Sequence, residues 1–180
     1  MFLQESLLQN LATALSQICP NASGFSQKME ETFLRYSSED LSGEYARLFV
    51  GPYELKAPPY GSVYLDHERR VMGDSTMAVL KMYEEAGLVI DGDFRELPDH
   101  IAAELEFMYY LVYQEVRALE TSKMDRALAL KGTQDLFLNR LLKPWIPHFR
   151  REIKESTENE FYDALADCLL VFVKEQSPAI

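Results

Sequence analysis

Carboxylates and an imidazole gather at one predicted helix start in the middle of this chain. Asp99 and His100 follow Pro98, and Glu104 lies one helical turn beyond His100 on the same face. A surface that presents Asp, His and Glu together can accept a guanidinium group in a forked pair. The positive end of the helix dipole partly opposes such a cation, so the carboxylates must outweigh it. The same residues also fit an ordinary helix cap, provided by Asp99, with a solvated first turn.

The sequence offers little for catalysis or metal binding. The three histidines, His67, His100 and His148, are not spaced as metal ligands, and Cys19 and Cys168 belong to no C-x-x-C pair. No phosphate-binding glycine loop and no G-x-S-x-G elbow occurs. We therefore expect no metal, no other cofactor and no enzymatic activity, and Cys168 should be a buried core thiol.

The segment from Phe49 to Asp66 is rich in proline, glycine and aromatic residues. Its three prolines and two glycines exclude a continuous helix. Tyrosines stand at Tyr53, Tyr60 and Tyr64, and rigid amphipathic rings on a proline-stiffened segment suit the binding of another chain. The alternative is a structural connector whose tyrosines plug the top of a core.

Apolar residues at three- and four-residue spacing predict helices through most of the remaining chain. We expect them at 2–18, 26–36 and 41–49, from 76 to Ala86, from 98–99 to about 119, from 124 to 141, and from a capping box at 157–160 onward. Prolines at 144 and 147 should end the sixth of these. No alternating run is long enough for a sheet, so the prediction is an all-α, single-domain helical bundle over residues 1–180, with the aromatic segment as a connector between its N-terminal and C-terminal helices.

Charge and hydropathy exclude several classes of partner. The chain has 180 residues and a net charge of −11, which argues against nucleic acid and against anionic membrane surfaces. The N-terminus lacks the basic and apolar regions of a signal peptide, and no apolar run reaches the length of a membrane span. We therefore expect a cytoplasmic protein with no nucleic acid partner and no membrane insertion.

Several motifs together resemble those of the TorD/DmsD/NarJ family, and most closely its TorD/DmsD branch. They are Phe49-x-Gly-Pro, Ala57-Pro-Pro-Tyr-Gly-Ser-Val-Tyr-Leu-Asp66, Gly73-Asp-Ser-Thr76, Glu96-Leu-Pro-Asp-His-Ile-Ala-Ala-Glu-Leu-Glu-Phe-Met108 and Lys143-Pro-Trp-x-x-x-Phe149. The resemblance implies an all-helical cytoplasmic chaperone that matures molybdenum-containing redox enzymes. Such a chaperone binds the twin-arginine signal peptide of a reductase subunit, of the DMSO or TMAO reductase kind. It delays export until the cofactor is inserted and the client is folded.

The resemblance also implies site residues and partners. Asp99 and His100 match the family's signal-peptide-binding pair, and Glu104 joins them by its spacing. The aromatic segment that lines the same pocket contributes Leu48, Phe49, Tyr53, Pro59, Tyr60 and Tyr64. The expected partners are the signal peptide and the body of the reductase, and the chain is expected to be a monomer or a domain-swapped dimer.

Two other functions stay open at this point. The first is a nucleotide-binding or nucleotide-hydrolysing protein, because nucleotide binding has been proposed for family members. The second is a structural helical subunit of a larger complex, without a peptide site.

Overall fold

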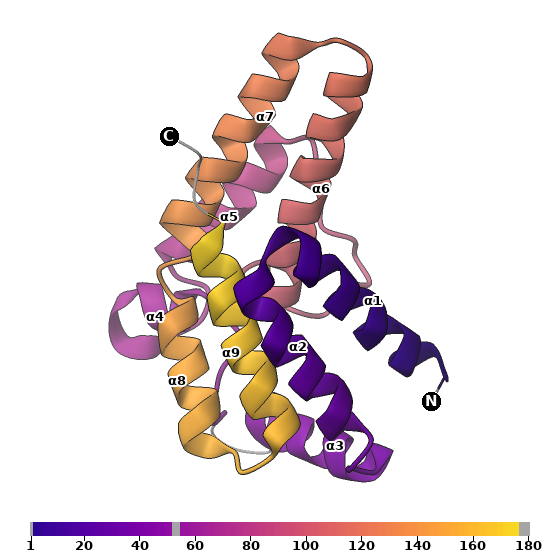
Figure 1. Cartoon of the computed structure of the whole chain (residues 1–180). Helices are drawn as coiled ribbons and strands as arrows, with labels where there is room; N and C mark the ends of the chain where they lie inside the picture. Colours follow the sequence, from indigo (N-terminus) through magenta and orange to yellow (C-terminus); the bar gives the residue numbers. More distant parts are fainter. Residues whose placement is uncertain (1, 52–54, 177–180) are drawn as a thin grey trace. The chain divides into compact units, whose positions relative to one another are not determined.

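The computed structural model describes residues 2–51 and 55–176, with side chains from Ser6 onward, and the chain is helical through most of its length (Figure 1). Within those residues the β-type pairing consists of one isolated antiparallel bridge, between Tyr60 and His100. The prediction of an all-α fold is confirmed. No helix in the described ranges combines the length and the hydropathy needed to cross a bilayer.

The helical elements follow one another closely along the chain. They are α1 (Phe2–Ile18), α2 (Pro20–Phe33), α3 (Ser38–Tyr45), the π-helix η1 (Ala46–Val50), α4 (Ser62–Leu65), the 3-10 helix η2 (His67–Arg69), α5 (Asp74–Glu85), α6 (Ile101–Glu120), α7 (Met124–Phe137), the π-helix η3 (Leu138–Leu142), α8 (Ile146–Ser156) and α9 (Glu160–Glu175). The connector predicted to be non-helical, Phe49 to Asp66, overlaps the end of η1 and contains the one-turn helix α4, so it is free of a long helix but not of helical turns.

The chain divides into two compact units, which we describe one at a time. Among the described residues, the first unit joins the segment up to Pro58 with the segment 146–176, so it contains the N-terminal and C-terminal helices. The second unit runs from Pro59 to Trp145. Whether the whole chain behaves as one domain stays a prediction.

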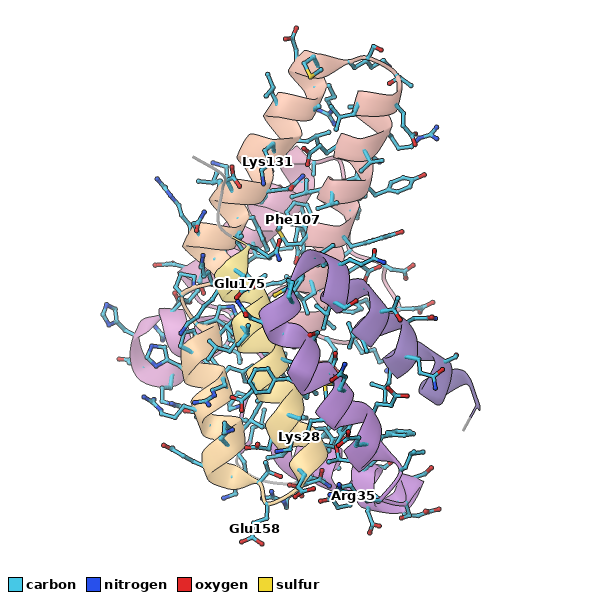
Figure 2. The ribbon with its side chains drawn as sticks, in the orientation of Figure 1. Lys28, Arg35, Phe107, Lys131, Glu158 and Glu175 are labelled. Atoms are coloured by element: carbon cyan, nitrogen blue, oxygen red, sulfur yellow. The ribbon has the colours of Figure 1, made fainter. Side chains whose placement is uncertain are left out.

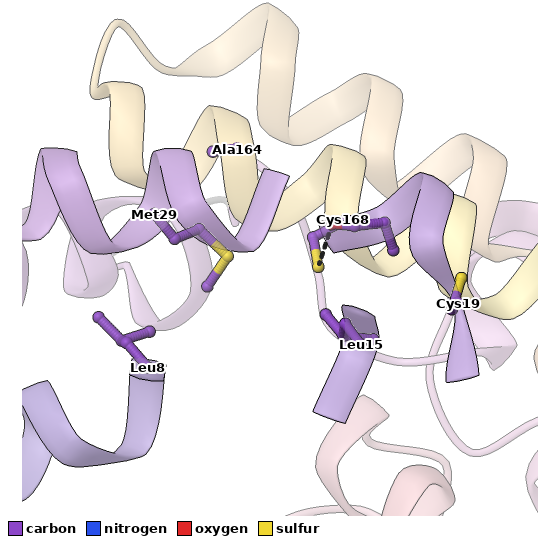
Figure 3. Packing of buried hydrophobic residues seen from close by; sticks show 7 residues of the cluster. Leu8, Leu15, Cys19, Met29, Ala164 and Cys168 are labelled. Atoms are coloured by element: carbon purple, nitrogen blue, oxygen red, sulfur yellow. Dashed lines mark hydrogen bonds between the residues drawn. The ribbon is translucent and has the colours of Figure 1, made fainter. Parts of the chain in front are cut away.

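The first unit is built around α2, which packs against α1 and α9, while α9 also packs against α8. Its core is a cluster of small and apolar side chains: Leu8, Leu15, Cys19, Ala22, Met29, Ala164 and Cys168 (Figure 3). The Cys168 thiol donates a weak hydrogen bond to the carbonyl oxygen of Ala22 at 3.9 Å. The prediction that Cys168 is a buried core thiol is confirmed.

The second unit is built on the pair of helices α6 and α7, which lie side by side and antiparallel (Figure 1). Phe107 of α6, labelled in Figure 2, packs against aromatic rings of α5 and α7. Its ring centroid lies 4.6 Å from that of Tyr83 on α5 and 4.8 Å from that of Phe137 on α7. These three buried rings form the centre of the unit's core, because aromatic side chains bury large apolar areas.

Two predicted helix boundaries next to prolines are wrong. Helix α2 begins at Pro20, not near residue 26, and Gly24 lies inside it. Helix α8 was not predicted, because Pro147 was expected to stop a helix but instead lies in the first turn of α8. A proline in the first turn has no intrahelical N–H bond to lose, and its fixed φ favours a helix start.

Side-chain caps account for two further boundaries. Helix α3 begins at Ser38, three residues before the predicted start at 41, because Ser37 and Asp40 form a capping box there. The box predicted at Thr157–Glu160 is wrong, because Asn159 caps α9 by accepting from the N–H groups of Phe161 and Tyr162. The Thr157 hydroxyl accepts from the Asn159 N–H, so it supports the capping residue.

Candidate functional site

The connector is fastened to the start of α6 by backbone hydrogen bonds on both sides of the Tyr60–His100 bridge. The Ile101 N–H donates to the Pro59 carbonyl oxygen at 2.9 Å, and the Gly61 N–H donates to the Asp99 carbonyl oxygen at 2.9 Å. Two sequence motifs that lie about forty residues apart therefore form one continuous piece of structure.

Asp99, whose carbonyl oxygen takes part in this junction, has a fully buried side chain. Its Oδ2 accepts a hydrogen bond of 2.7 Å from the backbone N–H of Ser62, at the start of α4. The prediction that Asp99 caps α6 is wrong, because the capping atom is Nδ1 of His100, which accepts from the Ala102 N–H at 3.1 Å. The Asp99 carboxylate instead holds the connector in place.

Glu104 is also fully buried, and the indole N–H of Trp145 donates to its Oε2 at 3.1 Å. Burial, and to a smaller extent the negative charge of Asp99, raises the pKa of Glu104 to about 8, although the Trp145 hydrogen bond opposes the shift. The carboxyl is therefore largely neutral at pH 7. The expectation that Asp99 and Glu104 present two carboxylates at the surface is wrong in this structure.

The buried side chains of Asp99, Glu104, Ser62 and Thr76 form a cluster that is rich in hydrogen-bond acceptors. Oδ1 of Asp99 and Oε1 of Glu104 have no hydrogen-bond partner among the described residues, and neither have the hydroxyl oxygens of Ser62 and Thr76. A proton on Glu104 gives this cluster one more donor, which agrees with the raised pKa of Glu104. The cluster is therefore buried beneath the connector, with Glu104 as its additional donor.

Tyr60, His100 and Glu96 form the accessible part of this region. The rings of Tyr60 and His100 are half-buried and meet edge to face, with centroids 5.4 Å apart. The Tyr60 hydroxyl donates to Oε2 of the exposed Glu96 at 2.7 Å. Burial lowers the pKa of His100, although the charges of Glu96 and Asp99 oppose this shift. Glu96 was not predicted as a site residue, although it begins the family motif that contains Pro98, Asp99 and His100.

Tyr64 and Trp145 extend the aromatic lining. Their rings stack with centroids 5.6 Å apart and an interplanar angle of 11°. The guanidinium carbon of Arg69 lies 5.6 Å from the centroid of the Tyr64 ring. Trp145 is fully buried, whereas Tyr64 is half-buried, so the tyrosine is the member of the pair that a ligand can reach.

Leu48 and Phe49, the other predicted site residues with described positions, belong to the first unit. Leu48 is buried, and Phe49 is half-buried and packs its ring against Phe149 and Tyr162. Tyr53 lies outside the described residues.

The region is suited to binding a cation beside apolar groups. It joins an exposed carboxylate, a half-buried imidazole and two half-buried tyrosine rings on a backbone that hydrogen bonds fix in place. Among the residues that the structure describes, no three His, Cys, Asp or Glu side chains gather closely enough to hold a metal ion.

Comparison with known sequences gives a family match over most of the chain. A family model described as nitrate reductase delta subunit matches residues 4–151. The chaperone protein TorD of Photobacterium profundum is 31% identical over 133 residues, which cover 74% of this chain and 60% of that protein. The Tat proofreading chaperone DmsD of Salmonella typhi is 33% identical over 133 residues, with 74% and 58% covered. The matched region thus spans about 60% of the length of these relatives.

Comparison with solved structures supports the fold. A crystal structure of a candidate redox enzyme maturation protein from Archaeoglobus fulgidus superposes with a TM-score of 0.58 and 22% sequence identity. The superposition covers 93% of this chain and 82% of the other. At this identity the similarity establishes the all-helical fold alone.

Proposed function

This chain belongs to the TorD/DmsD/NarJ family, and on that premise we propose that it is a cytoplasmic maturation chaperone for a molybdenum-containing reductase subunit. In this proposal it binds the twin-arginine signal peptide of its client and delays export until cofactor insertion and folding are complete. It acts by binding and catalyses no reaction. The names of its relatives support the chaperone role, since both are called chaperones and one is called a Tat proofreading chaperone.

One observation carries the peptide-binding proposal: the hydrogen-bonded and aromatic contact of Tyr60 with Glu96 and His100 at the surface of the second unit. A twin-arginine peptide brings two guanidinium groups followed by an apolar stretch. The Glu96 carboxylate can accept a guanidinium in a charge-assisted pair, and the tyrosine rings can pack against the apolar stretch.

Tyr64 offers a second place for a guanidinium. Arg69 already lies over the face of this ring at a cation–π distance. An arginine of the peptide would take this position in place of Arg69, since Trp145 already stacks on the Tyr64 ring.

The buried carboxyl groups of Asp99 and Glu104 do not contact the peptide in this proposal. Asp99 and Glu104 act as positioning residues, because each bonds to a segment remote in sequence and neither reaches solvent. His100 acts in both ways, since it caps α6 and shows part of its ring at the surface.

The test is a calorimetric titration of the protein with a signal peptide that contains Arg-Arg, and with the same peptide carrying Lys-Lys. We expect Glu96→Gln to weaken binding of the Arg-Arg peptide about tenfold, since a charge-assisted contact contributes on the order of 1.5–3 kcal/mol. Glutamine retains the oxygen that accepts from Tyr60, so the local structure should persist.

The matched control is Asp93→Asn, which removes an exposed negative charge from the same loop without touching Tyr60. It should change the affinity less than twofold. Equal binding of the two peptides, or equal losses in the two variants, would contradict the proposed site.

A further inference from the structure

A hollow of about 290 Å³ lies in the second unit, between α6 and the loop that follows α5. It is lined by four aromatic rings, those of Tyr83, Phe94, Phe107 and Tyr110. Tyr83 and Phe107 are buried, so their rings form its floor, whereas Phe94 is 39% exposed and Tyr110 is half-buried. The aliphatic side chains of residues 88–90 complete the apolar wall. The hollow can therefore enclose an apolar group.

The hydroxyl groups of the two tyrosines are bonded to the backbone of the same unit. The Tyr83 hydroxyl donates to the Pro98 carbonyl oxygen at 3.0 Å, and the Tyr110 hydroxyl donates to the Ala86 carbonyl oxygen at 3.4 Å. Because the protein itself accepts from both hydroxyls, the tyrosines offer the hollow mainly their ring surface. The face of an aromatic ring attracts a cation as well as an apolar group.

Two carboxylates line the same hollow, Asp91 from the loop and Glu106 from α6, and both are exposed. A hydrogen-bonded turn holds the first of them beside Phe94. The Asp91 carbonyl oxygen accepts from the Phe94 N–H at 3.0 Å, and Oδ1 of Asp91 accepts from the Asp93 N–H at 2.8 Å. Among the residues that the structure describes, no lysine, arginine or histidine lines the hollow. Its charge is therefore negative beside an aromatic surface.

We propose that this hollow binds a small organic cation, in which an ammonium group is attached to an apolar body. The rings and the aliphatic wall enclose the body, while Asp91, Glu106 and the ring faces attract the charged group. The volume is at the low end for ligand pockets, which favours one small molecule over a segment of polypeptide. This binding activity goes beyond the proposed chaperone function and does not depend on it.

Calorimetric titration with three probes of similar size and different charge tests the ligand class. The probes are phenylethylammonium, phenylethanol and phenylpropionate. We expect the cation to bind with a dissociation constant of about 0.1–1 mM, the alcohol to bind at least about fivefold more weakly, and the anion to show no measurable binding. Equal affinities for the cation and the alcohol, or no binding of the cation up to about 10 mM, would overturn the proposal.

Substitution of the two carboxylates tests the source of the charge preference. Glu106→Gln and Asp91→Asn should each weaken phenylethylammonium binding by about 3- to 10-fold and should change phenylethanol binding by less than about twofold. Asparagine keeps the oxygen that accepts from the Asp93 N–H, so the turn should persist. Asp93→Asn is the matched control, because Asp93 is exposed in the same loop but does not line the hollow. Equal losses in all three variants would contradict a specific role of the two carboxylates.

Filling the hollow tests its location. Ala103 of α6 lines the hollow, so the larger side chain of Ala103→Leu should occupy part of the space and abolish binding of both phenylethylammonium and phenylethanol. Ala102→Leu adds the same side chain at an exposed position outside the hollow and should leave both affinities unchanged. Circular dichroism shows whether each variant is folded. Retained binding by a folded Ala103→Leu variant would place the cation elsewhere and overturn the proposal.

One pair of variants separates this hollow from the proposed peptide site. Glu96 does not line the hollow, so Glu96→Gln should weaken binding of the Arg-Arg peptide and change phenylethylammonium binding by less than about twofold. Glu106→Gln should do the reverse. A protein that binds phenylethylammonium but no signal peptide would contradict the proposed function alone. Displacement of phenylethylammonium by the Arg-Arg peptide would assign the hollow to the peptide and overturn the present proposal.

Discussion

The indole N–H of Trp145 donates a 3.1 Å hydrogen bond to the buried carboxyl group of Glu104, which lies 41 residues earlier in the chain. The same two side chains enclose Gly61 of the connector, since a Cβ atom there would lie 3.1 Å from the indole nitrogen and 3.2 Å from Oε1 of Glu104. This contact joins the end of the second unit, the first turn of α6 and the connector. The protonation state of the Glu104 carboxyl should therefore affect the free energy of unfolding of the second unit.

Glu104 should make the protein less stable as the pH rises. The pKa of Glu104 is about 8 in the folded chain, against an ordinary value of 4.5 in the unfolded chain, so the folded state binds more protons between these values. The contribution of Glu104 is fully present below about pH 4.5 and is lost as the pH rises through about 8. Glu104→Gln, which keeps the acceptor for Trp145, should lack this loss. Urea denaturation of both proteins between about pH 5 and about pH 9 should show a difference of a few kcal/mol developing.

Trp145 provides a spectroscopic check of the same titration. It is the single tryptophan of the chain, and its indole bonds directly to Glu104. The emission of the native protein should change with a midpoint near pH 8, and Glu104→Gln should show no such transition. A transition that persists in the variant would assign the titration to another group.

Asp99 should be a structural residue first. Asp99→Ala leaves the Ser62 N–H buried without its acceptor, so we expect a loss of about 2 kcal/mol in the free energy of unfolding. Asp99→Asn keeps an oxygen in the same place and should lose clearly less. The control Asp93→Ala removes an exposed carboxylate and should stay within about 0.5 kcal/mol of wild type. If Asp99→Ala were as stable as the control, the hydrogen bond from Ser62 would not contribute to the stability of the fold.

Gly73 and Gly132 should respond in opposite ways to alanine. A Cβ at Gly73 would lie 2.1 Å from Oδ2 and 2.8 Å from Cγ of Asp66, whose carboxylate accepts from the N–H and hydroxyl groups of Ser75. Gly73→Ala must displace this carboxylate from the start of α5 and should destabilise the protein by about 1–3 kcal/mol.

Gly132 is the matched control for Gly73. It lies inside α7, and a Cβ there meets nothing within 4 Å. Gly132→Ala should stabilise the protein by roughly 0.5–1 kcal/mol, because alanine favours the helix over the unfolded chain. Thermal denaturation of both variants measures the contrast, and a shift of the same sign in both would refute the role given to the Asp66 contact.

The two cysteines should react slowly with thiol reagents while the protein is folded. Burial raises the pKa of Cys168 to about 11, and it also raises the pKa of Cys19, whose thiol donates to the Glu175 carboxylate. Little reactive thiolate is therefore present near pH 8. Labelling with an aromatic disulfide should be slow in buffer and should reach two thiols per chain in denaturant. Rapid labelling of the native protein would show that the core of the first unit opens readily.

Local sequence signals determined much of the secondary structure. The span of α1 and the cap of α3 at Ser37 follow from residues no more than four positions apart. The same holds for Gly87, which has a φ of 79° and follows the C-cap residue Ala86 of α5. Such interactions form within one helical turn, so they can be recognised from the sequence alone. The family also follows from motifs in the sequence.

The tertiary structure decided what those motifs do. Pro98-Asp-His suggested that Asp99 caps a helix, but the fold brings Ser62 to its carboxylate and leaves the cap to His100. Glu104 changed from a proposed surface carboxylate to a buried, largely neutral acid, because the chain returns 41 residues later with Trp145. Burial and hydrogen bonds to residues distant in sequence set the position and charge of these groups. No local sequence pattern specifies which distant residue will form the hydrogen bond.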